Sequence, residues 1–209
     1  MNIESLLTKK TNLVENDSLT VFDGWAAQQN PKAFEVFYNF IKEVRPSRIL
    51  EIGTSLGGFT RFLNEVCKNL NVDCNILTYD IYGRQEYNIL INEGIDLRIE
   101  NVFNDSYTTL KESVINFIQT PGVTIVLCDG GDKVREFNLI SDYLKSGDYI
   151  LAHDYAENAE VFQKEVFMKS WNWHEISEHN ITEACNKNNL IDYKREIFTE
   201  AVWVCKIKE

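Results

Sequence analysis

Acidic side chains come directly after two apolar runs in the second half of the chain. Asp129 follows the run at 123–128, and His153 and Asp154 follow the run at 149–152. Apolar runs of this length are typical of buried parallel strands, whose carboxyl ends meet at one edge of a sheet. We therefore expect the two carboxylates and the imidazole to converge in one site, where they could hold a divalent cation or remove a proton from a hydroxyl group.

These two chemistries remain open alternatives at the level of the sequence. In the first, Asp129 and Asp154 bind Mg²⁺ or another divalent cation, which holds an acceptor hydroxyl and lowers its pKa. In the second, no metal is needed and His153 or Asp132 acts as the general base. A plainer interpretation is that these groups only cap helix N-termini at the sheet edge. Lys133, beside the cluster, is expected to pair with a neighbouring carboxylate.

A glycine-rich turn lies earlier in the chain, within the sequence RILEIGTSLGGFT at residues 48–60. Gly53 and Gly57 permit a sharp bend and the close approach of a ligand, and Thr54 and Ser55 are residues that favour helix starts. The spacing lacks the G-x-G-x-x-G of dinucleotide sites and the Gly-Lys-Ser/Thr of a P-loop. The pattern predicts a nucleotide-type cradle, with a tight turn that binds nothing as the alternative.

Two more polar residues follow the next predicted strands. Asp80 ends the strand predicted at 75–80, and its carboxylate could accept hydrogen bonds from both ribose hydroxyls of a nucleoside. Asn101 follows in the segment 96–103, which is predicted to be a third strand with its connection. An Asn side chain can donate to and accept from a purine edge, although it can also satisfy its own loop backbone.

The glycine turn, together with Glu51 at the end of its strand, resembles motif I of the class I S-adenosylmethionine-dependent methyltransferases. In that family the loop passes around the methionine part of the cofactor, and the acid lies near the amino group of the cofactor. The resemblance covers about residues 33–155. It implies S-adenosylmethionine as the cofactor and the following cofactor-binding residues: Glu51, Gly53, Thr54, Ser55, Gly57, Asp80, Asn101, Val102 and Asp129.

The acid cluster is similar to that of the metal-dependent O-methyltransferases, most closely the sugar O-methyltransferase and cephalosporin-hydroxylase-like group. That group has an Asp after strand four and an acidic pair or Asp-Asn after strand five, which implies metal ligands at Asp129 and Asp154. This chain departs from it because His153 and Tyr155 flank Asp154 where a second acid or Asn is expected. Asp132 also stands where some related enzymes have a His. The catalytic residues implied are Asp129, His153 and Asp154.

The elements that position these residues alternate along the chain. Strands are predicted at 48–52, 75–80, 96–103, 123–128 and 149–152, and helices at 31–45, 58–69, 84–93, 106–119, 133–145 and 157–170. Such βα units predict an α/β fold, a Rossmann-like three-layer αβα sandwich. Segments 173–179 and 200–208 are predicted to form an antiparallel pair with no helix between them. The resemblance implies a seven-stranded, mostly parallel sheet of order 3-2-1-4-5-7-6 with an antiparallel final strand.

The size and composition of the chain predict a single domain. It has 209 residues, of which 44% are hydrophobic and 25% are charged, which is ordinary for a globular protein. Residues 31–209 are expected to form the core of a methyltransferase domain. Residues 1–30 are expected to form an N-terminal extension that packs on the site or caps it, with Phe22 and Trp25 as anchors.

The net charge of −11 argues against a nucleic-acid partner, because binding to phosphates requires concentrated Lys and Arg. No apolar run approaches the roughly 20 residues of a membrane helix, and residues 1–5 do not look like a signal peptide. Five cysteines without C-x-x-C spacing favour free thiols, which are typical of the cytoplasm. We therefore expect a cytoplasmic protein, and the lack of a long apolar run predicts that it does not bind membranes. Trp171 and Trp173 could line a substrate or close a homodimer, although a place in the core or at its rim is the simpler interpretation.

These observations lead to one functional hypothesis and two rivals. The resemblance implies methyl transfer from S-adenosylmethionine to a hydroxyl group of a small molecule or sugar. The first rival is a nicotinamide-dependent oxidoreductase on a similar sheet, which the missing G-x-G-x-x-G disfavours. The second is a non-catalytic binding module with the same fold, because a fold does not by itself imply an activity.

Overall fold

The computed structural model describes residues 3–7, 10–12, 20–85 and 87–209 of the chain. Its centre is a seven-stranded sheet of order β6-β5-β4-β7-β8-β10-β9. The strands are β4 (Arg48–Ile52), β5 (Asn75–Asp80), β6 (Asp96–Ile99), β7 (Thr124–Cys128), β8 (Tyr149–His153), β9 (Leu190–Asp192) and β10 (Trp203–Lys208). Counted along the chain, the order is 3-2-1-4-5-7-6, and only β10 runs antiparallel to its neighbours. The predicted topology is confirmed.

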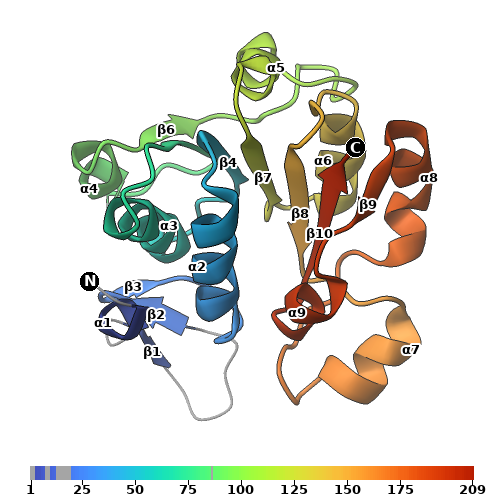
Figure 1. Cartoon of the computed structure of the whole chain (residues 1–209), viewed down its shortest axis with the longest axis horizontal. Helices are drawn as coiled ribbons and strands as arrows, with labels where there is room; N and C mark the ends of the chain where they lie inside the picture. The colour runs from blue at the N-terminus through green and yellow to red at the C-terminus, as the bar shows by residue number, and fades with distance from the viewer. Residues whose placement is uncertain (1–2, 8–9, 13–19, 86) are drawn as a thin grey trace.

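Helices cover both faces of this sheet, which gives the predicted three layers (Figure 1). Successive residues of β4 alternate between the faces, with Ile49 in one hydrophobic cluster and Leu50 in the other. The first cluster includes residues of α2 (Ala33–Val44), α3 (Gly58–Asn69), α4 (Tyr87–Asn92) and α9 (Arg195–Glu200). The second includes residues of α5 (Glu112–Gln119), α6 (Lys133–Ser141) and α8 (Glu178–Asn188).

The elements around the glycine turn lie where the sequence predicts them. β4 and α3 span the predicted residues, because a fully buried apolar run and an amphipathic helix give unambiguous patterns. Helix α5 begins only at Glu112 and not at residue 106, since Asn104 Oδ1 accepts bonds from the backbone of Thr108 and Thr109 and holds a turn there. One residue of the helix predicted at 84–93, Glu86, lies outside the described residues.

The prediction for the segment after β8 is wrong in detail. Residues 173–179 do not form a strand, because Ser177 and Asn180 make a capping box that starts α8. The sixth strand is instead the short β9, and α9 separates it from β10. The helix predicted at 157–170 is limited to α7 (Ala159–Val161) and a π-helical turn at Phe162–Val166. His174 lies in the loop before α8 and His179 within α8, not on an edge strand.

The N-terminal segment forms α1 (Ile3–Leu7) and a small antiparallel sheet of β1 (Lys10–Asn12), β2 (Thr20–Phe22) and β3 (Trp25–Ala26). The ring of Phe22 is fully buried against Phe62 of α3, and Arg61 lies 5.2 Å from the ring centroid of Trp25. These contacts anchor the segment to the body, as predicted. The sequence analysis expects no signal peptide at residues 1–5, and residues 1–2 of that segment lie outside the described residues. Figure 1 shows the small sheet and α7 at the same end of the molecule.

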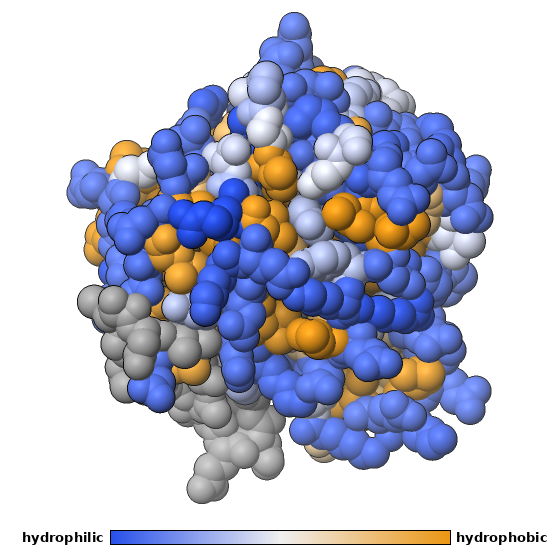
Figure 2. Space-filling view, viewed as in Figure 1, coloured by the Kyte–Doolittle hydropathy of each residue, from blue (hydrophilic) through white to orange (hydrophobic). Residues whose placement is uncertain are grey.

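The face shown in Figure 2 is mostly polar. Exposed hydrophobic residues form separate patches on it.

Within the described part of the chain, no helix combines the length and the hydropathy that a membrane span requires. All five cysteines are free thiols, and four of them are buried.

Candidate active site

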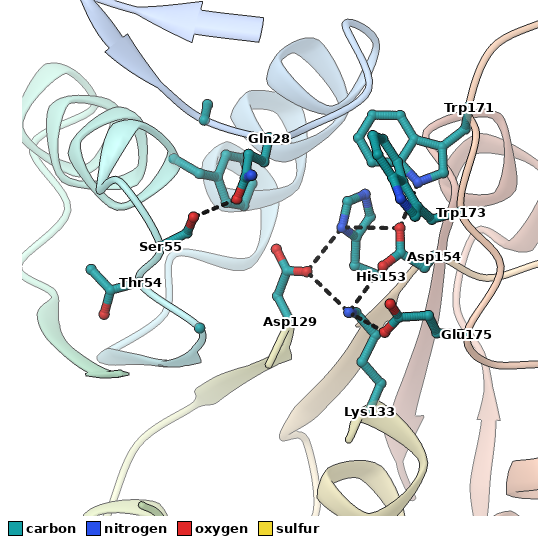
Figure 3. A pocket seen from close by; sticks show the side chains of 13 residues that line it. Gln28, Thr54, Ser55, Asp129, Lys133, His153, Asp154, Trp171, Trp173 and Glu175 are labelled. Carbon is teal, nitrogen blue, oxygen red and sulfur yellow. Dashed lines mark hydrogen bonds and ion pairs between the residues drawn. The ribbon is translucent and has the colours of Figure 1, made fainter. Parts of the chain in front are cut away.

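A pocket of about 210 Å³ opens at the carboxyl edge of the sheet (Figure 3). It lies between the turn after β4, the ends of β7 and β8, and the loop that precedes α8. The N-terminal segment closes one side of it. The lining residues are Ala27, Gln28, Gly53, Thr54, Ser55, Phe59, Asp129, Lys133, His153, Asp154, Trp171, Trp173 and Glu175.

The predicted acid cluster forms one wall of this pocket. Nδ1 of His153 lies 2.9 Å from Oδ1 of Asp129 and 3.7 Å from Oδ1 of Asp154. The other oxygen of Asp129 accepts a 2.7 Å hydrogen bond from the side-chain amide of Gln29. Neighbouring parallel strands thus bring Asp129 next to His153, which is 24 residues further along the chain. Of the three, Asp129 is the most exposed to the pocket, at 16% of its side chain, against 2% for His153.

Lys133, the first residue of α6, enters the same cluster from below in Figure 3. Its ammonium nitrogen lies 2.9 Å from Asp154, 2.8 Å from Glu175 and 3.8 Å from Asp129. Burial opposes the charge, but Asp129 and Asp154 outweigh it, so the pKa of Lys133 lies above its usual range. The predicted pairing of Lys133 with a neighbouring carboxylate is confirmed.

Asp154 is held by its own strained backbone and by aromatic neighbours. Its φ of 58° lies in the left-handed region, which is uncommon outside glycine and often marks functional sites. The indole nitrogen of Trp171 donates a 2.5 Å bond to Oδ1 of Asp154. Burial opposes ionisation, but the charges of His153 and Lys133 hold the pKa of Asp154 below its usual range.

The ring of His153 lies between two indoles. It stacks on Trp203 at a centroid distance of 4.8 Å and lies tilted against Trp171 at 4.9 Å. Its Nε2 atom is buried and has no hydrogen-bond partner among the described residues. A proton on that atom would be a buried donor without an acceptor, which is costly. Because the Asp129 carboxylate can only accept, Nδ1 of His153 carries the proton of their hydrogen bond.

The glycine turn forms the opposite wall. Gly53 has a φ of +97°, and a Cβ atom there would lie 2.2 Å from the carbonyl oxygen of Asp129. Ser55 has a φ of 50°, and its hydroxyl donates to the side chain of Gln28. The backbone N–H of Ser55 donates a 2.8 Å bond to Asp80, whose other oxygen accepts from the N–H of Tyr82. Asp80 therefore lies beside the turn and holds it.

The remaining residues of the predicted cofactor site lie outside the pocket lining. Glu51 is buried beneath the turn, where its Oε2 accepts 2.6 Å bonds from Thr60 and Thr78. Asn101 accepts a bond from the backbone of Phe103, and Val102 is buried in the core.

Gly57 is also outside the lining, and a Cβ atom there would lie 2.9 Å from a methyl group of Leu90 in α4. Its left-handed conformation, with a φ of +80°, shapes the start of α3. The absence of a side chain at this position therefore serves the packing of the turn on α4.

Sequence reasoning missed Gln28, Gln29 and Glu175, because no local pattern marks a polar loop residue that reaches a distant site. The predicted alternative base Asp132 does not line the pocket. It caps α6 by accepting from the N–H of Arg135, with which it also forms an ion pair. Trp171 is buried at 3% exposure, whereas Trp173 is 46% exposed at the rim.

We expect Gly53→Ala to destabilise the protein and to weaken cofactor binding. The new Cβ clashes with the Asp129 carbonyl, and the left-handed φ disfavours any side chain. The loss in free energy of unfolding should be about 2–4 kcal/mol. Gly94→Ala is the control, because Gly94 has a similar φ of +89° but open space around it. Urea denaturation of both variants measures the difference; equal losses would show that the close contact with Asp129 does not matter.

We expect Glu51 to make the protein less stable as the pH rises through neutrality. Burial outweighs the hydrogen bonds from Thr60 and Thr78 and raises the pKa of Glu51 from 4.5 to about 7. The folded protein therefore binds more protons than the unfolded chain between these values, and the free energy of unfolding falls as the pH rises from about 5 to 8. The contribution of Glu51 to this fall is roughly 2–3 kcal/mol. Glu51→Gln should flatten the dependence measured by urea denaturation at pH 5.5 and 8; a slope equal to the wild type's would refute the assignment.

The spacing of the acid cluster is compatible with a divalent cation. One ligand atom from each of Asp129, His153 and Asp154 lies within 4.8 Å of the others. Mg²⁺, however, prefers oxygen ligands, and this set contains only two carboxylates and a nitrogen that already faces Asp129. The ammonium of Lys133 also lies against Asp154. As arranged here, the described residues do not fit a bound Mg²⁺.

Comparison with known proteins identifies related families and folds. A family model described as rhamnosyl O-methyltransferase/CmcI matches residues 18–196. The structure of apo CmcI-N160 is 15% identical, with 90% of this chain and 76% of that chain covered and a TM-score of 0.63. CmcI-D160 described with Mg and SAM is 16% identical over the same shares, with a TM-score of 0.59.

An O-methyltransferase family protein from Burkholderia thailandensis is 13% identical over 85% of this chain and 56% of that chain, with a TM-score of 0.53. The comparison with curated protein sequences found no match. At these identities the solved structures show the shared fold. The family model, which spans most of the chain, identifies the family.

Proposed function

Because this chain belongs to the rhamnosyl O-methyltransferase/CmcI family of S-adenosylmethionine-dependent methyltransferases, we propose that it methylates a hydroxyl group of a small molecule or sugar. The observation that carries this proposal is the pair of walls that face each other across the pocket. The glycine turn at Gly53 lies on one side, and the Asp129 carboxylate lies on the other. A methyl donor held by the turn would lie next to a group that can accept the hydroxyl proton.

In this proposal the turn holds the methionine part of the cofactor through Gly53, Thr54 and Ser55. Asp80 receives the ribose hydroxyls, and Asn101 and Val102 lie near the adenine. The pocket volume of about 210 Å³ is below the roughly 300–1,000 Å³ of a typical ligand site. It therefore suits the methyl-bearing end of the cofactor and the reacting end of the acceptor. The anionic wall also suits the positive charge of a sulfonium group.

Glu51 and Gly57 support this site from outside the lining. Glu51 fixes the turn from beneath through Thr60 and Thr78. Gly57 allows α3 to start directly behind the turn. Both residues thus act on the shape of the turn and not by contact with the methyl group.

The cofactor supplies an activated methyl group on its sulfonium sulfur. The protein must position the acceptor oxygen in line with that methyl group and receive its proton. We assign the proton to Asp129, because Asp129 is more exposed than His153 and because His153 already donates Nδ1–H to it. Gln29 and His153 each hold one oxygen of Asp129, which fixes the carboxylate plane. In this proposal His153 and Asp154 are positioning residues, and Asp129 takes the role of base that the sequence analysis gave to His153 or Asp132.

The exposed ring of Trp173 is the proposed platform for the acceptor. It packs edge-on against Trp171 at 5.1 Å, and the exposed 46% of the residue would take the apolar face of a sugar ring. We expect Trp173→Ala to raise the KM for the acceptor about tenfold, an effect of about 1.4 kcal/mol, with little change in S-adenosylhomocysteine affinity. Tyr107→Ala, which removes an exposed aromatic ring outside the pocket lining, is the control.

Methyl transfer to a panel of sugars, phenols, amines and carbon acceptors tests the proposed function. Transfer to oxygen is the expected result. Transfer only to amines or carbon acceptors would contradict the assignment of Asp129 as the proton acceptor for a hydroxyl group.

The family assignment removes the nicotinamide-dependent alternative. We propose that the whole chain is one methyltransferase domain whose N-terminal 30 residues cap the site; contacts of Gln28 and Gln29 with the pocket support this. The cytoplasmic location, the absence of nucleic-acid and membrane partners, and the homodimer stay predictions.

A further inference from the structure

We propose that the Lys133 ammonium is a built-in cation that takes the place of a divalent metal in this site, so that methyl transfer needs no metal. Its role in catalysis rests on the proposed function, whereas its effect on metal binding does not. Within this site Lys133 is a positioning residue, because it acts through the carboxylates that surround it.

The surroundings of Lys133 already satisfy its ammonium group. An ammonium group has three N–H donors. Three acceptors lie within 3 Å of the nitrogen: Asp154 at 2.9 Å, Glu175 at 2.8 Å and the carbonyl oxygen of Gly130 at 2.9 Å. The side chain is 5% exposed. The positive charge is thus fixed among the carboxylates and is not free to leave for solvent.

The loop before α6 aims Lys133 inward. Glu136 is buried and accepts bonds from the backbone N–H groups of Gly130 and Asp132. A Cβ atom at Gly130 would lie 2.2 Å from Oε1 of Glu136, so a larger residue at position 130 would displace this carboxylate from the loop. Asp132 caps the helix, and Lys133 follows it into the pocket. The hydrogen bonds of buried Glu136 therefore hold the loop in the conformation that directs Lys133 into the pocket.

Charge and ligand type both favour the ammonium over a metal. Asp129, Asp154 and Glu175 bring three negative charges to one side of the pocket, and a cation among them relieves their repulsion. A divalent ion on Asp154 would have to displace Lys133 or lie beside its charge. If the metal ion also bound Nδ1 of His153, the hydrogen bond between His153 and Asp129 would be lost. If it did not, the ion would have only two protein ligands, Asp129 and Asp154. Lys133 avoids these costs because it is part of the fold.

In the reaction, Lys133 keeps Asp154 and Glu175 engaged, so that Asp129 alone faces the acceptor. The hydroxyl oxygen forms the new bond to the methyl carbon, the bond between carbon and sulfur breaks, and the hydroxyl proton passes to Asp129. No electrons are gained or lost by the protein, and no co-reactant besides the methyl donor and acceptor is required.

Mn²⁺ binding, followed by electron paramagnetic resonance of the free ion, tests the proposal on the full chain with and without S-adenosylhomocysteine. We expect the wild type and Lys133→Arg to bind no Mn²⁺ below millimolar concentration. Lys133→Met, which removes the charge but keeps the length of the side chain, should bind Mn²⁺ at least tenfold more tightly. The double variant with Asp154→Asn should lose that gain.

Two results would overturn the proposal. One is micromolar Mn²⁺ binding by the wild type, which stands as a test even if Lys133→Met does not fold. The other is a folded Lys133→Met protein, checked by circular dichroism, that binds Mn²⁺ no better than the wild type. Metal binding as expected, without methyl transfer to any acceptor, would refute the proposed function and leave this role of Lys133 in place.

Discussion

Replacing Asp129 with Asn should lower the rate of methyl transfer by about 10²–10³-fold, the usual range for the loss of a proton acceptor. The amide is close in shape to the carboxylate but cannot take the proton of the acceptor hydroxyl. Asn can still accept from His153 through its oxygen, whereas its amide nitrogen cannot accept from Gln29, so the variant loses the Gln29 contact together with the proton acceptor. The fall should appear in kcat, with the affinity for S-adenosylhomocysteine changed much less.

Asp132→Asn is the matched control for this variant. Asp132 is in the same loop but does not line the pocket, and Asn is also a good N-cap residue for α6. Its kcat should stay within about twofold of the wild type. Single-turnover methyl transfer with each variant measures the effect. If Asp129→Asn kept the wild-type rate while His153→Ala lost it, the general base would be His153, as one reading of the sequence suggests.

The second large effect is expected at Asp80, where Ala should weaken S-adenosylhomocysteine binding by about 1.5–3 kcal/mol, or roughly 10- to 150-fold. The loss has two parts. The proposed charge-assisted bonds to the ribose disappear, and the backbone of Ser55 loses the acceptor that holds the turn. Asp80→Asn should recover part of the affinity, because one amide oxygen can still accept.

Calorimetric titration of S-adenosylhomocysteine measures this effect, with Asp73→Ala as the control. Asp73 is exposed just before β5, whereas Asp80 lies at the other end of the same strand. The control should bind like the wild type. Equal affinity of Asp80→Ala and the wild type would place the ribose elsewhere and remove Asp80 from the cofactor site.

The fold was predictable where local patterns and burial agree. The run at β4 and the stripe of α3 face the core along their whole length, so their composition reveals them. β9 was not predictable, because it has three residues of which only Leu190 is buried. The alternation at 173–179 misled because Ile176 is buried by its pairing with Tyr155, a contact that no local pattern encodes.

The convergence of Asp129 and Asp154 was predictable in the same way, since strand ends in a parallel sheet determine it. The partners that decide the chemistry were not. Gln29 is 100 residues before the carboxylate it binds, and Glu175 is 42 residues after Lys133. The packing of the N-terminal segment and of the loop before α8 brings them in. The sequence therefore left the metal and base mechanisms open, and the placement of Lys133 and Gln29 is what supports the proposed mechanism without a metal.

Tracing a ¹³C-labelled methyl group tests most directly whether the protein methylates an oxygen atom without a metal. S-adenosylmethionine carrying that label is incubated with the protein, a hydroxyl acceptor and excess chelator, and the product is examined by NMR. We expect a methyl ether on the acceptor oxygen, formed by the wild type in chelator and lost with Asp129→Asn. A label on nitrogen or carbon, or an ether formed equally well by Asp129→Asn, would contradict it.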